Sequence, residues 1–376
     1  MEWPIRVPGY PPVIDQTLDI LAGLIACDTC NPPRRIGPEH EVFARLHDWL
    51  GPAFSWQIVD HGQGRVAALA QRGETPLLFN VHLDTVPAGE GWSGDPLVAR
   101  VGPDRVTGRG ACDIKGAAAC LVAAAGGTDQ PLAILFTTDE EGSANCCVRR
   151  FCEAAADARP GLVIVAEPTG CQVLDRHRGY LSVAGTFHGI PGHTSRHQEL
   201  ENSAVHQAIH WAAGALERVA GFESGLPAGN SLCFNIGRLD GGTKNNMIAG
   251  QCRVTWSMRP PPEVNPARLL ELVSADANGP RVQWQTTFAG SPLPATDECS
   301  AHRRIIDRFC RDQGWPRAER AADFWTEAGI FSEFGMPAIV FGPGDIRQAH
   351  AVDEWVSIAQ LQQATDMYCS LIAHGS

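Results

Sequence analysis

Short apolar runs alternate with stretches of helical periodicity through the first half of the chain. Apolar runs at residues 77–81, 132–137 and 162–166 are bounded by glycine, proline or charged residues, a pattern typical of buried strands. Residues 114–125 are rich in alanine and have the length of a helix that packs closely on such a sheet. The pattern predicts an α/β fold with a central, mostly parallel sheet flanked by helices. It also predicts helices at 13–26, 39–50 and 148–156, and strands at 56–59 and 66–70.

The pattern changes near residue 179 and returns to its first form near residue 290. Between these points, alternating and helical segments follow in the order β-α-β-β-α-β, which is the split βαβ arrangement of a ferredoxin-like domain. The segments are 180–187, 202–219, 232–236, 252–258, 267–273 and 282–288. Beyond residue 300 come a helix, a strand at 338–341 and a closing helix at 358–372. We therefore expect one α/β domain built from residues 1–178 and 290–376, with a smaller α+β domain inserted at 179–289.

Composition argues against several classes of partner. The chain has 376 residues, of which 44% are hydrophobic and 19% charged, as is ordinary for a globular protein. Its net charge of −12 argues against nucleic acid and anionic membrane as partners, because both require basic patches. The sequence has no recognisable signal peptide and no apolar stretch of the ~20 residues that span a bilayer.

The 13 cysteines are odd in number and scattered through the expected helices and strands. We therefore expect buried, reduced thiols rather than a disulfide framework, and a cytoplasmic location. Cys27 and Cys30 have the C-x-x-C spacing of redox and zinc sites, but no second pair lies near them in the sequence. A structural role is the simpler interpretation.

Histidine and carboxylate residues follow the ends of the predicted strands. In α/β sheets, ligands bind outside the carboxyl ends of the strands. Side chains at these positions are therefore expected to gather at one edge of the sheet, with enough charge for two divalent cations. They are His82, Asp84, Asp113, Glu140, Glu141, Glu167 and His350. The set predicts a metal-dependent hydrolase.

The donor types narrow the choice of metal and suggest a mechanism. One histidine per metal with several carboxylates is a mixed nitrogen and oxygen set, which suits Zn²⁺, Co²⁺ or Mn²⁺. A carboxylate that bridges two cations holds them roughly 3.5–4 Å apart, and water between them loses its proton near neutrality. Successive side chains at a strand end point in opposite directions, so one of Glu140 and Glu141 can ligate while the other acts as general base. Asp84 is placed to orient the His82 ring.

Simpler interpretations exist for several of these residues. An acidic residue beside a helix start often caps the helix, and Asp113 could cap the helix expected from residue 114. Asp353 and Glu354 are expected to do little more than that. A metal-free binding protein on the same fold is the alternative from another functional class. The complete ligand set, with Glu140 beside Glu141, argues against it because a binding module needs no general base.

Five motifs together resemble the M20 metallopeptidase family, which also includes deacylases. They occur in order and cover nearly the whole chain: His82-Leu83-Asp84-Thr85-Val86-Pro87, Gly108-Arg109-Gly110-Ala111-Cys112-Asp113-Ile114-Lys115-Gly116, Thr138-Asp139-Glu140-Glu141, Ala166-Glu167-Pro168-Thr169 and Ala349-His350. Within the family, Trp325-Thr326-Glu327-Ala328 resembles the acetylornithine deacetylases. The preceding Asp323-Phe324 and the segment Phe234-Asn235-Ile236-Gly237-Arg238 are most similar to the branch that deacetylates N-acetyl-L-citrulline.

The resemblance implies a role for each candidate ligand. Asp113 would bridge two divalent ions, Zn²⁺ or Co²⁺, with one or both positions filled. His82 and Glu167 would complete one metal site. Glu141 and His350 would complete the other.

The resemblance also implies roles beyond metal binding. Glu140 would be the general base. The inserted domain would serve as a lid and dimerisation domain, in which His193 reaches the partner subunit's active site in a homodimer and stabilises the oxyanion. Asn245 and Arg259 would hold the substrate, and an arginine suits a bidentate grip on an α-carboxylate. Glu327 is the candidate for contact with the substrate side chain.

The implied reaction is hydrolysis of N-acetyl-L-citrulline or N-acetyl-L-ornithine to acetate and the free amino acid, in arginine biosynthesis. Succinyl-diaminopimelate desuccinylase and aminopeptidase or dipeptidase activities are the alternatives within the family. The chain departs from many relatives at Cys112, whose thiol beside the bridging Asp113 could bias the choice of metal.

Overall fold

The computed structural model describes residues 12–33, 35–142, 146–155, 159–195, 197–227, 230–262, 264–275, 282–295 and 300–374. The chain forms two compact units. Unit 1 consists of Met1–Asp175, Glu298–Arg320 and Thr326–Ser376, and unit 2 of Arg176–Asp297 and Ala321–Trp325. The division into a catalytic and a lid domain at the boundaries given above stays a prediction.

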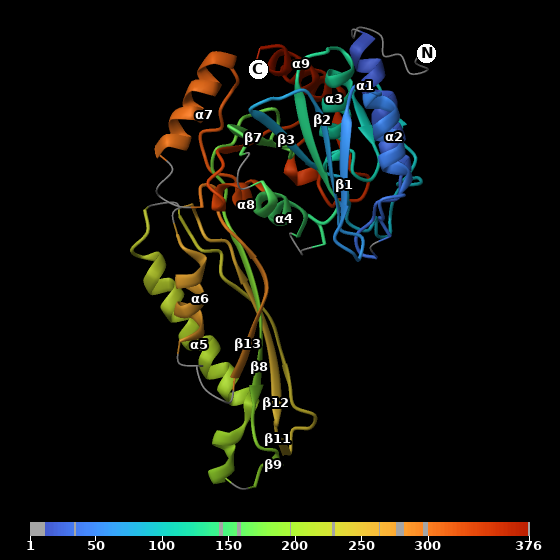
Figure 1. Cartoon of the computed structure of the whole chain (residues 1–376). Helices are drawn as coiled ribbons and strands as arrows, with labels where there is room; N and C mark the ends of the chain where they lie inside the picture. The colour runs from blue at the N-terminus through green and yellow to red at the C-terminus, as the bar shows by residue number, and fades with distance from the viewer. Residues whose placement is uncertain are drawn as a thin grey trace. The chain divides into compact units, whose positions relative to one another are not determined.

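Unit 1 contains a mixed, mostly parallel sheet (Figure 1). In the described residues its strand order is β1-β2-β6-β3-β7-β14. The strands β6, β3, β7 and β14 run parallel to one another. At one edge, β2 pairs antiparallel with β6, and β1 pairs antiparallel with β2. Their bounds are β1 (Ser55–Asp60), β2 (Val66–Arg72), β3 (Leu77–His82), β6 (Leu132–Thr137), β7 (Leu162–Val165) and β14 (Ala338–Val340). The predicted α/β sheet is confirmed.

The apolar runs form strands because the centre of this sheet is covered on both faces. Every residue of β6 and of β7 is buried, so their sequences are continuously apolar rather than alternating. Helix α3 (Lys115–Gly126) is buried from Lys115 to Ala125, and its alanines allow close contact with α1 (Pro12–Ala26) and α9 (Ile358–His374). Unit 1 also contains α2 (Glu41–Leu50), α4 (Cys146–Ala154), α7 (Ser300–Gln313) and α8 (Ala328–Glu333). No helix in the described ranges has the length and apolar character needed to cross a membrane.

A small sheet brings two distant loops together. Its short strands β4 (Arg100–Val101), β5 (Arg105–Thr107) and β15 (Trp355–Ser357) pair antiparallel in the order β15-β5-β4. The sequence does not predict them, because strands of two or three residues have no readable periodicity. Since Trp355 pairs with Thr107, the loop that precedes β15 lies beside the loop that follows β5.

Unit 2 has the element order β-α-β-β-α-β with an antiparallel sheet ordered β10-β12-β8-β13. Helices α5 and α6 share one apolar core with the sheet, and Ser203 and Asn265 cap them by accepting hydrogen bonds from backbone N–H groups. The pair β9 (Gly192–His193) and β11 (Met247–Ile248) forms a separate two-stranded ladder. The main elements are β8 (Tyr180–His188), α5 (Ala204–Glu223), β10 (Asn235–Gly241), β12 (Gln251–Met258), α6 (Pro266–Ser274) and β13 (Val282–Gly290).

The expected strand at 232–236 is misplaced. The strand β10 begins only at Asn235 and continues to Gly241. Leu232 is buried in the core of unit 2, so this apolar position belongs to the segment before the strand. The strand itself lies at the sheet edge and exposes Arg238 and Asp240. An exposed edge strand has no apolar alternation, which is why the pattern misses it.

Candidate metal centre

Parallel strands deliver four of the candidate ligand and base residues to one edge of the unit 1 sheet. His82 is the last residue of β3, and Glu167 follows the end of β7. Glu140 and Glu141 lie in the turn after β6. Because β6, β3 and β7 are parallel neighbours, their carboxyl ends meet at this edge.

Asp113 and His350 reach the same edge from loops. The N-cap residue of α3 is Ile114 and no side chain caps the helix, so the alternative that Asp113 caps it is wrong. The Asp113 carboxylate instead lies between two histidines. Its Oδ1 atom is 3.2 Å from His82 Nε2, and its Oδ2 atom is 3.3 Å from His350 Nε2. A carboxylate that turns one oxygen to each of two imidazoles has the geometry of a bridging ligand.

The described residues contain two groups of side chains that could hold a metal ion. His82, Asp113 and Glu167 form one group, and Asp113, Glu141 and His350 form the other, with the ligand atoms of each group within 4.8 Å of one another. Glu167 Oε1 lies 4.0 Å from His82 Nε2, and Glu141 Oε1 lies 3.0 Å from His350 Nε2. This is the division that the family resemblance implies. The role of each residue as a ligand stays a prediction.

The ionisable groups of this cluster perturb one another strongly. Burial raises the pKa of Glu140 and of Glu167 well above the usual range, and neighbouring carboxylates raise both further, against the opposing effect of His82. Burial acts on His82 in the opposite direction, but its contacts with Asp113 and Asp84 outweigh burial and raise its pKa. Hydrogen bonds to Asp113 and Glu141 raise the pKa of His350 to about 10.

Divalent cations fit this donor set. Each group offers one imidazole nitrogen and carboxylate oxygens, a mixture suited to Zn²⁺ or Co²⁺. A cation between buried carboxylates favours their ionised form and so opposes the effect of burial on Glu167 and Glu141. The neighbouring thiol of Cys112 is in neither group. Its Sγ atom donates to the Asp345 carbonyl at 3.3 Å, and burial raises the pKa of the thiol, which keeps it protonated.

Asp84 contacts residues of both groups. The His82 Nδ1 atom lies 3.0 Å from the backbone carbonyl of Asp84 and 3.5 Å from its Oδ1 atom, so the carbonyl is the nearer acceptor. The other carboxylate oxygen, Oδ2, accepts hydrogen bonds from the Asn31 side chain at 3.1 Å and from Glu141 N at 2.9 Å. Asp84 is completely buried, so these contacts are shielded from solvent.

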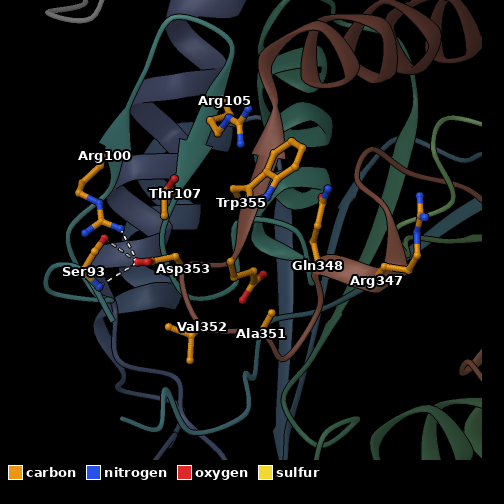
Figure 2. Close-up of a pocket in the computed structure, with 11 residues that line it drawn as sticks. Ser93, Arg100, Arg105, Thr107, Arg347, Gln348, Ala351, Val352, Asp353 and Trp355 are labelled. Atoms are coloured by element: carbon orange, nitrogen blue, oxygen red, sulfur yellow. Dashed lines mark hydrogen bonds and ion pairs between the residues drawn. The ribbon is translucent and has the colours of Figure 1, made fainter. Parts of the chain in front are cut away.

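Glu354 is a residue of the site that the sequence does not reveal. The expectation that Asp353 and Glu354 act only as helix caps is wrong. Glu354 is 1% exposed and accepts hydrogen bonds from the Arg109 side chain and from backbone N–H groups of the loop before α3. Asp353 accepts hydrogen bonds from Ser93 and Arg100 instead (Figure 2). An acidic pair shortly after a candidate histidine ligand is the signal that could have pointed to them.

The model of peptidase family M20/M25/M40 matches residues 78–374, a range that includes all of the candidate ligands. The chain belongs to this family. An N-acetyl-L-citrulline deacetylase from Xanthomonas campestris pv. campestris is 44% identical over 353 residues, which cover 93% of this chain and 96% of that protein. An acetylornithine deacetylase from Edwardsiella ictaluri is 31% identical over 86% of this chain and 87% of that protein.

A solved structure of an M20 family metallo-carboxypeptidase from Sulfolobus solfataricus is similar in fold. It has a TM-score of 0.69 at 16% identity, and the match covers 95% of this chain and 99% of that chain. The family resemblance noted in the sequence is confirmed.

In this M20 chain, His193 and Asn245 lie at the same end of unit 2. His193 belongs to β9 and pairs with Met247 of β11, and the turn that contains Asn245 directly precedes β11. Both side chains are exposed. The His193 Nδ1 atom accepts a hydrogen bond from Ser195 N at 3.2 Å, so the ring carries its hydrogen on Nε2 when neutral. The exposed Nε2–H group can therefore donate to a ligand.

Arg259 lies at the opposite end of β12. It follows Met258, the last residue of that strand, and its guanidinium group is 4.0 Å from the centroid of the Tyr180 ring. The strand from Gln251 to Met258 separates it from the end that holds β11, and at roughly 3.3 Å per residue this strand spans about 23 Å. The structure therefore separates Arg259 from His193 and Asn245 within unit 2.

Glu327 lies in unit 1 at the start of α8. It is 1% exposed, and its Oε2 atom accepts a hydrogen bond from Thr137 Oγ1 at 3.1 Å. Burial, reinforced by the charge of Asp139, raises the pKa of Glu327 to about 8. Its predicted contact with the substrate side chain stays a prediction.

Proposed function

We propose that this chain is a metal-dependent hydrolase that removes the acetyl group from N-acetyl-L-citrulline or N-acetyl-L-ornithine in arginine biosynthesis. The observation that carries the proposal is 44% identity over 93% of the chain to an N-acetyl-L-citrulline deacetylase. The two ligand groups that share Asp113 support it, because an enzyme of this kind requires them. The acetylornithine deacetylase from Edwardsiella ictaluri is less similar, at 31%, so N-acetyl-L-citrulline is our first choice of substrate.

The proposed cofactor is one or two divalent cations, Zn²⁺ or Co²⁺. Asp113 would bridge them, with His82 and Glu167 holding one and Glu141 and His350 the other. Cations held there would polarise the acetamide carbonyl and lower the pKa of the attacking water.

In this proposal Glu140 transfers the proton. It is half-buried beside the cluster, interacts with the charges of His82 and Glu167, and belongs to neither ligand group. Its carboxylate would take a proton from the water as the new C–O bond forms. It would then deliver this proton to the nitrogen as the C–N bond breaks, which yields acetate and the free α-amino group and regenerates the base.

Unit 2 would be a ferredoxin-like lid domain, and the enzyme a homodimer. The element order of unit 2 and its sheet order support the first part. The separation of His193 from Arg259 within unit 2 supports the proposed homodimer. If both residues contact one substrate molecule, the length of β12 favours an arrangement in which they come from different subunits of a symmetric dimer. His193 would then stabilise the oxyanion in the partner's active site. Asn245, at the same end of unit 2 as His193, would hold substrate there together with Arg259 of the partner subunit.

A cytoplasmic location is part of the proposal. Eleven cysteines whose side chains the structure describes are free, and most of them are buried. This is the state expected of thiols in a reducing compartment.

Substrate choice is tested by acetate release from N-acetyl-L-citrulline, N-acetyl-L-ornithine and other N-acetyl amino acids at one pH and one metal concentration. A site that hydrogen-bonds the ureido group of citrulline can reject an analogue that lacks it by ~10⁴ in kcat/KM. A clear preference for N-acetyl-L-ornithine would exclude the citrulline assignment. In that case Glu327→Gln should weaken use of the ammonium-bearing substrate selectively.

The same assay includes N-succinyl-diaminopimelate and dipeptides as competing substrates. Turnover of these alone would overturn the deacetylase proposal in favour of another activity of the family. Mass spectrometry of the purified protein measures its metal content. A protein that binds no metal and hydrolyses none of these compounds would be a binding protein on the same fold.

A further inference from the structure

The Glu354 carboxylate joins two loops that lie far apart in the sequence. Its Oε1 atom accepts hydrogen bonds from Cys112 N at 2.8 Å and from Asp113 N at 2.9 Å. Its Oε2 atom accepts from Gly110 N at 2.9 Å and from Arg109 Nη1 at 2.6 Å. Every one of these partners is an N–H donor, so the surroundings match an ionised carboxylate, which only accepts.

These hydrogen bonds fix the path of the loop that carries Asp113. The loop is tightly packed at Gly110, which has a φ of +82°, and a Cβ atom there would lie 2.8 Å from Lys115 Cδ. Only glycine adopts this conformation without strain. The Asp113 backbone is held directly by Glu354, so a displacement of the Glu354 carboxylate displaces the bridging ligand with it.

Glu354 also belongs to the loop that carries His350. The two residues lie between the 3-10 turn Ile346–Gln348 and strand β15, and β15 is anchored to β5. Glu354 is therefore linked to His350 through the short backbone segment 351–353, and to Asp113 by a hydrogen bond. These are two of the three residues in one candidate ligand group, whereas His82 and Glu167 in the other group are held by strands of the main sheet.

We propose that Glu354 is a positioning residue that sets the distance between Asp113 and His350 and thereby the affinity for divalent cations. This inference rests on the proposed metal site and not on the identity of the substrate. The ligand group of Asp113, Glu141 and His350 depends on Glu354 more than the group of His82, Asp113 and Glu167, because two of its members are held through Glu354.

Arg109 determines how the proposal is tested. It is buried, donates to the carbonyls of Pro87 and Ala88, and lies 5.0 Å from the centroid of the Trp92 ring. Removing the Glu354 charge leaves this buried guanidinium without its carboxylate, which destabilises the fold. Glu354→Asp retracts the carboxylate by one methylene and so lengthens its hydrogen bonds to the loop, but it keeps a negative charge near the buried Arg109 guanidinium. Glu354→Gln keeps the length and removes the charge.

Asp353→Asn is the matched control. Asp353 lies on the same loop but pairs with Ser93 and Arg100 at the border of a cavity of about 750 Å³ (Figure 2). The cavity is also lined by Arg105 and Arg347, and each of these is already paired with an aspartate.

The experiment is a titration of the metal-free full chain with Co²⁺. Calorimetry measures the affinity for Co²⁺, and the visible absorption spectrum of the bound ion reports its coordination. Changes in residues that orient metal ligands typically cost ~10–100-fold in metal affinity. We expect a loss of this size in Glu354→Asp, with a changed absorption spectrum, and at least as large a loss in any folded Glu354→Gln protein. Asp353→Asn should bind Co²⁺ like the wild type.

Wild-type Co²⁺ affinity and an unchanged spectrum in folded Glu354→Asp would overturn the proposal, even if Glu354→Gln fails to fold. A wild-type chain that binds no Co²⁺ would overturn the metal site itself. Failure of the deacetylase assignment leaves the result intact, because the titration contains no substrate.

Discussion

Glu141 N donates a hydrogen bond of 2.9 Å to Asp84 Oδ2, and this contact joins the carboxyl ends of β3 and β6. The backbone carbonyl of Asp84 accepts a hydrogen bond from the Nδ1 atom of the His82 ring at 3.0 Å. One buried aspartate thus positions a candidate ligand in each of the two groups. Asp84 therefore positions the Glu141 backbone as well as the His82 ring.

The first prediction follows from this contact. In Asp84→Asn the single amide oxygen can still accept from Glu141 N, but the new NH₂ group then faces the His82 Nδ1–H group. We expect metal affinity to fall by ~10–100-fold, as is typical when the partner of a ligating histidine is changed. Calorimetric titration of the metal-free protein measures the loss, with the exposed Asp104→Asn as control. Unchanged affinity at both cation positions would contradict the role given to Asp84.

The second prediction separates Glu140 from Glu141. Glu140→Gln should keep its metal, because Glu140 belongs to neither ligand group, and should lose ~10²–10⁴ in kcat through loss of the general base. Glu141→Gln should bind metal more weakly. Metal analysis of both purified variants, with initial rates, distinguishes them. If Glu140→Gln loses its metal together with its activity, the two assignments must be exchanged.

The elements that could be predicted from the sequence are those whose burial is uniform. β6 and β7 are buried on both faces, so their continuous apolar runs identify them directly. β10 exposes most of its length at a sheet edge, and its sequence contains no apolar pattern to detect. Local composition reports local burial, so sequence patterns do not identify a strand that is mostly exposed and lies at a sheet edge.

The candidate site divides in the same way. The clustering of His82 with Glu167 could be predicted because both lie at the carboxyl ends of buried parallel strands, which meet at one edge of the sheet. The contacts of Glu354 could not. They join residues separated by more than 240 positions in the sequence. Most of the donors are backbone N–H groups, which nearly every residue type has, so the sequence does not indicate which residues donate.

The third prediction concerns the proposed dimer. Subunits with His193→Ala and subunits with Glu140→Gln should each be nearly inactive alone. If His193 acts in the partner's active site, a mixed dimer contains one site with both groups intact and one with neither. A statistical 1:1 mixture should then recover about a quarter of the wild-type activity. Mixed dimers are purified with two different affinity tags, and inactive mixed dimers would place His193 in its own subunit's site or outside catalysis.

The fourth prediction is a pH dependence that is independent of the metal centre. His177 in unit 2 is completely buried, and its Nδ1–H group donates to the Arg178 carbonyl at 2.8 Å. Burial lowers the pKa of His177 from 6.5 to about 4. Between these values the unfolded chain binds a proton that the folded chain does not, so stability falls as the pH decreases from 6.5 toward 4.

A pKa difference of one unit corresponds to about 1.36 kcal/mol. The lowering of the His177 pKa from 6.5 to about 4 therefore corresponds to about 3 kcal/mol of folding stability that is lost in acid. The variant His177→Gln keeps a neutral hydrogen-bond donor for the Arg178 carbonyl at every pH. Its unfolding free energy should therefore fall less than that of the wild type between pH 7 and pH 4. Urea unfolding of the metal-free proteins at a series of pH values measures this, with the exposed His210→Gln as control. Parallel curves for wild type and His177→Gln would mean that His177 is protonated in the folded protein as readily as in the unfolded chain.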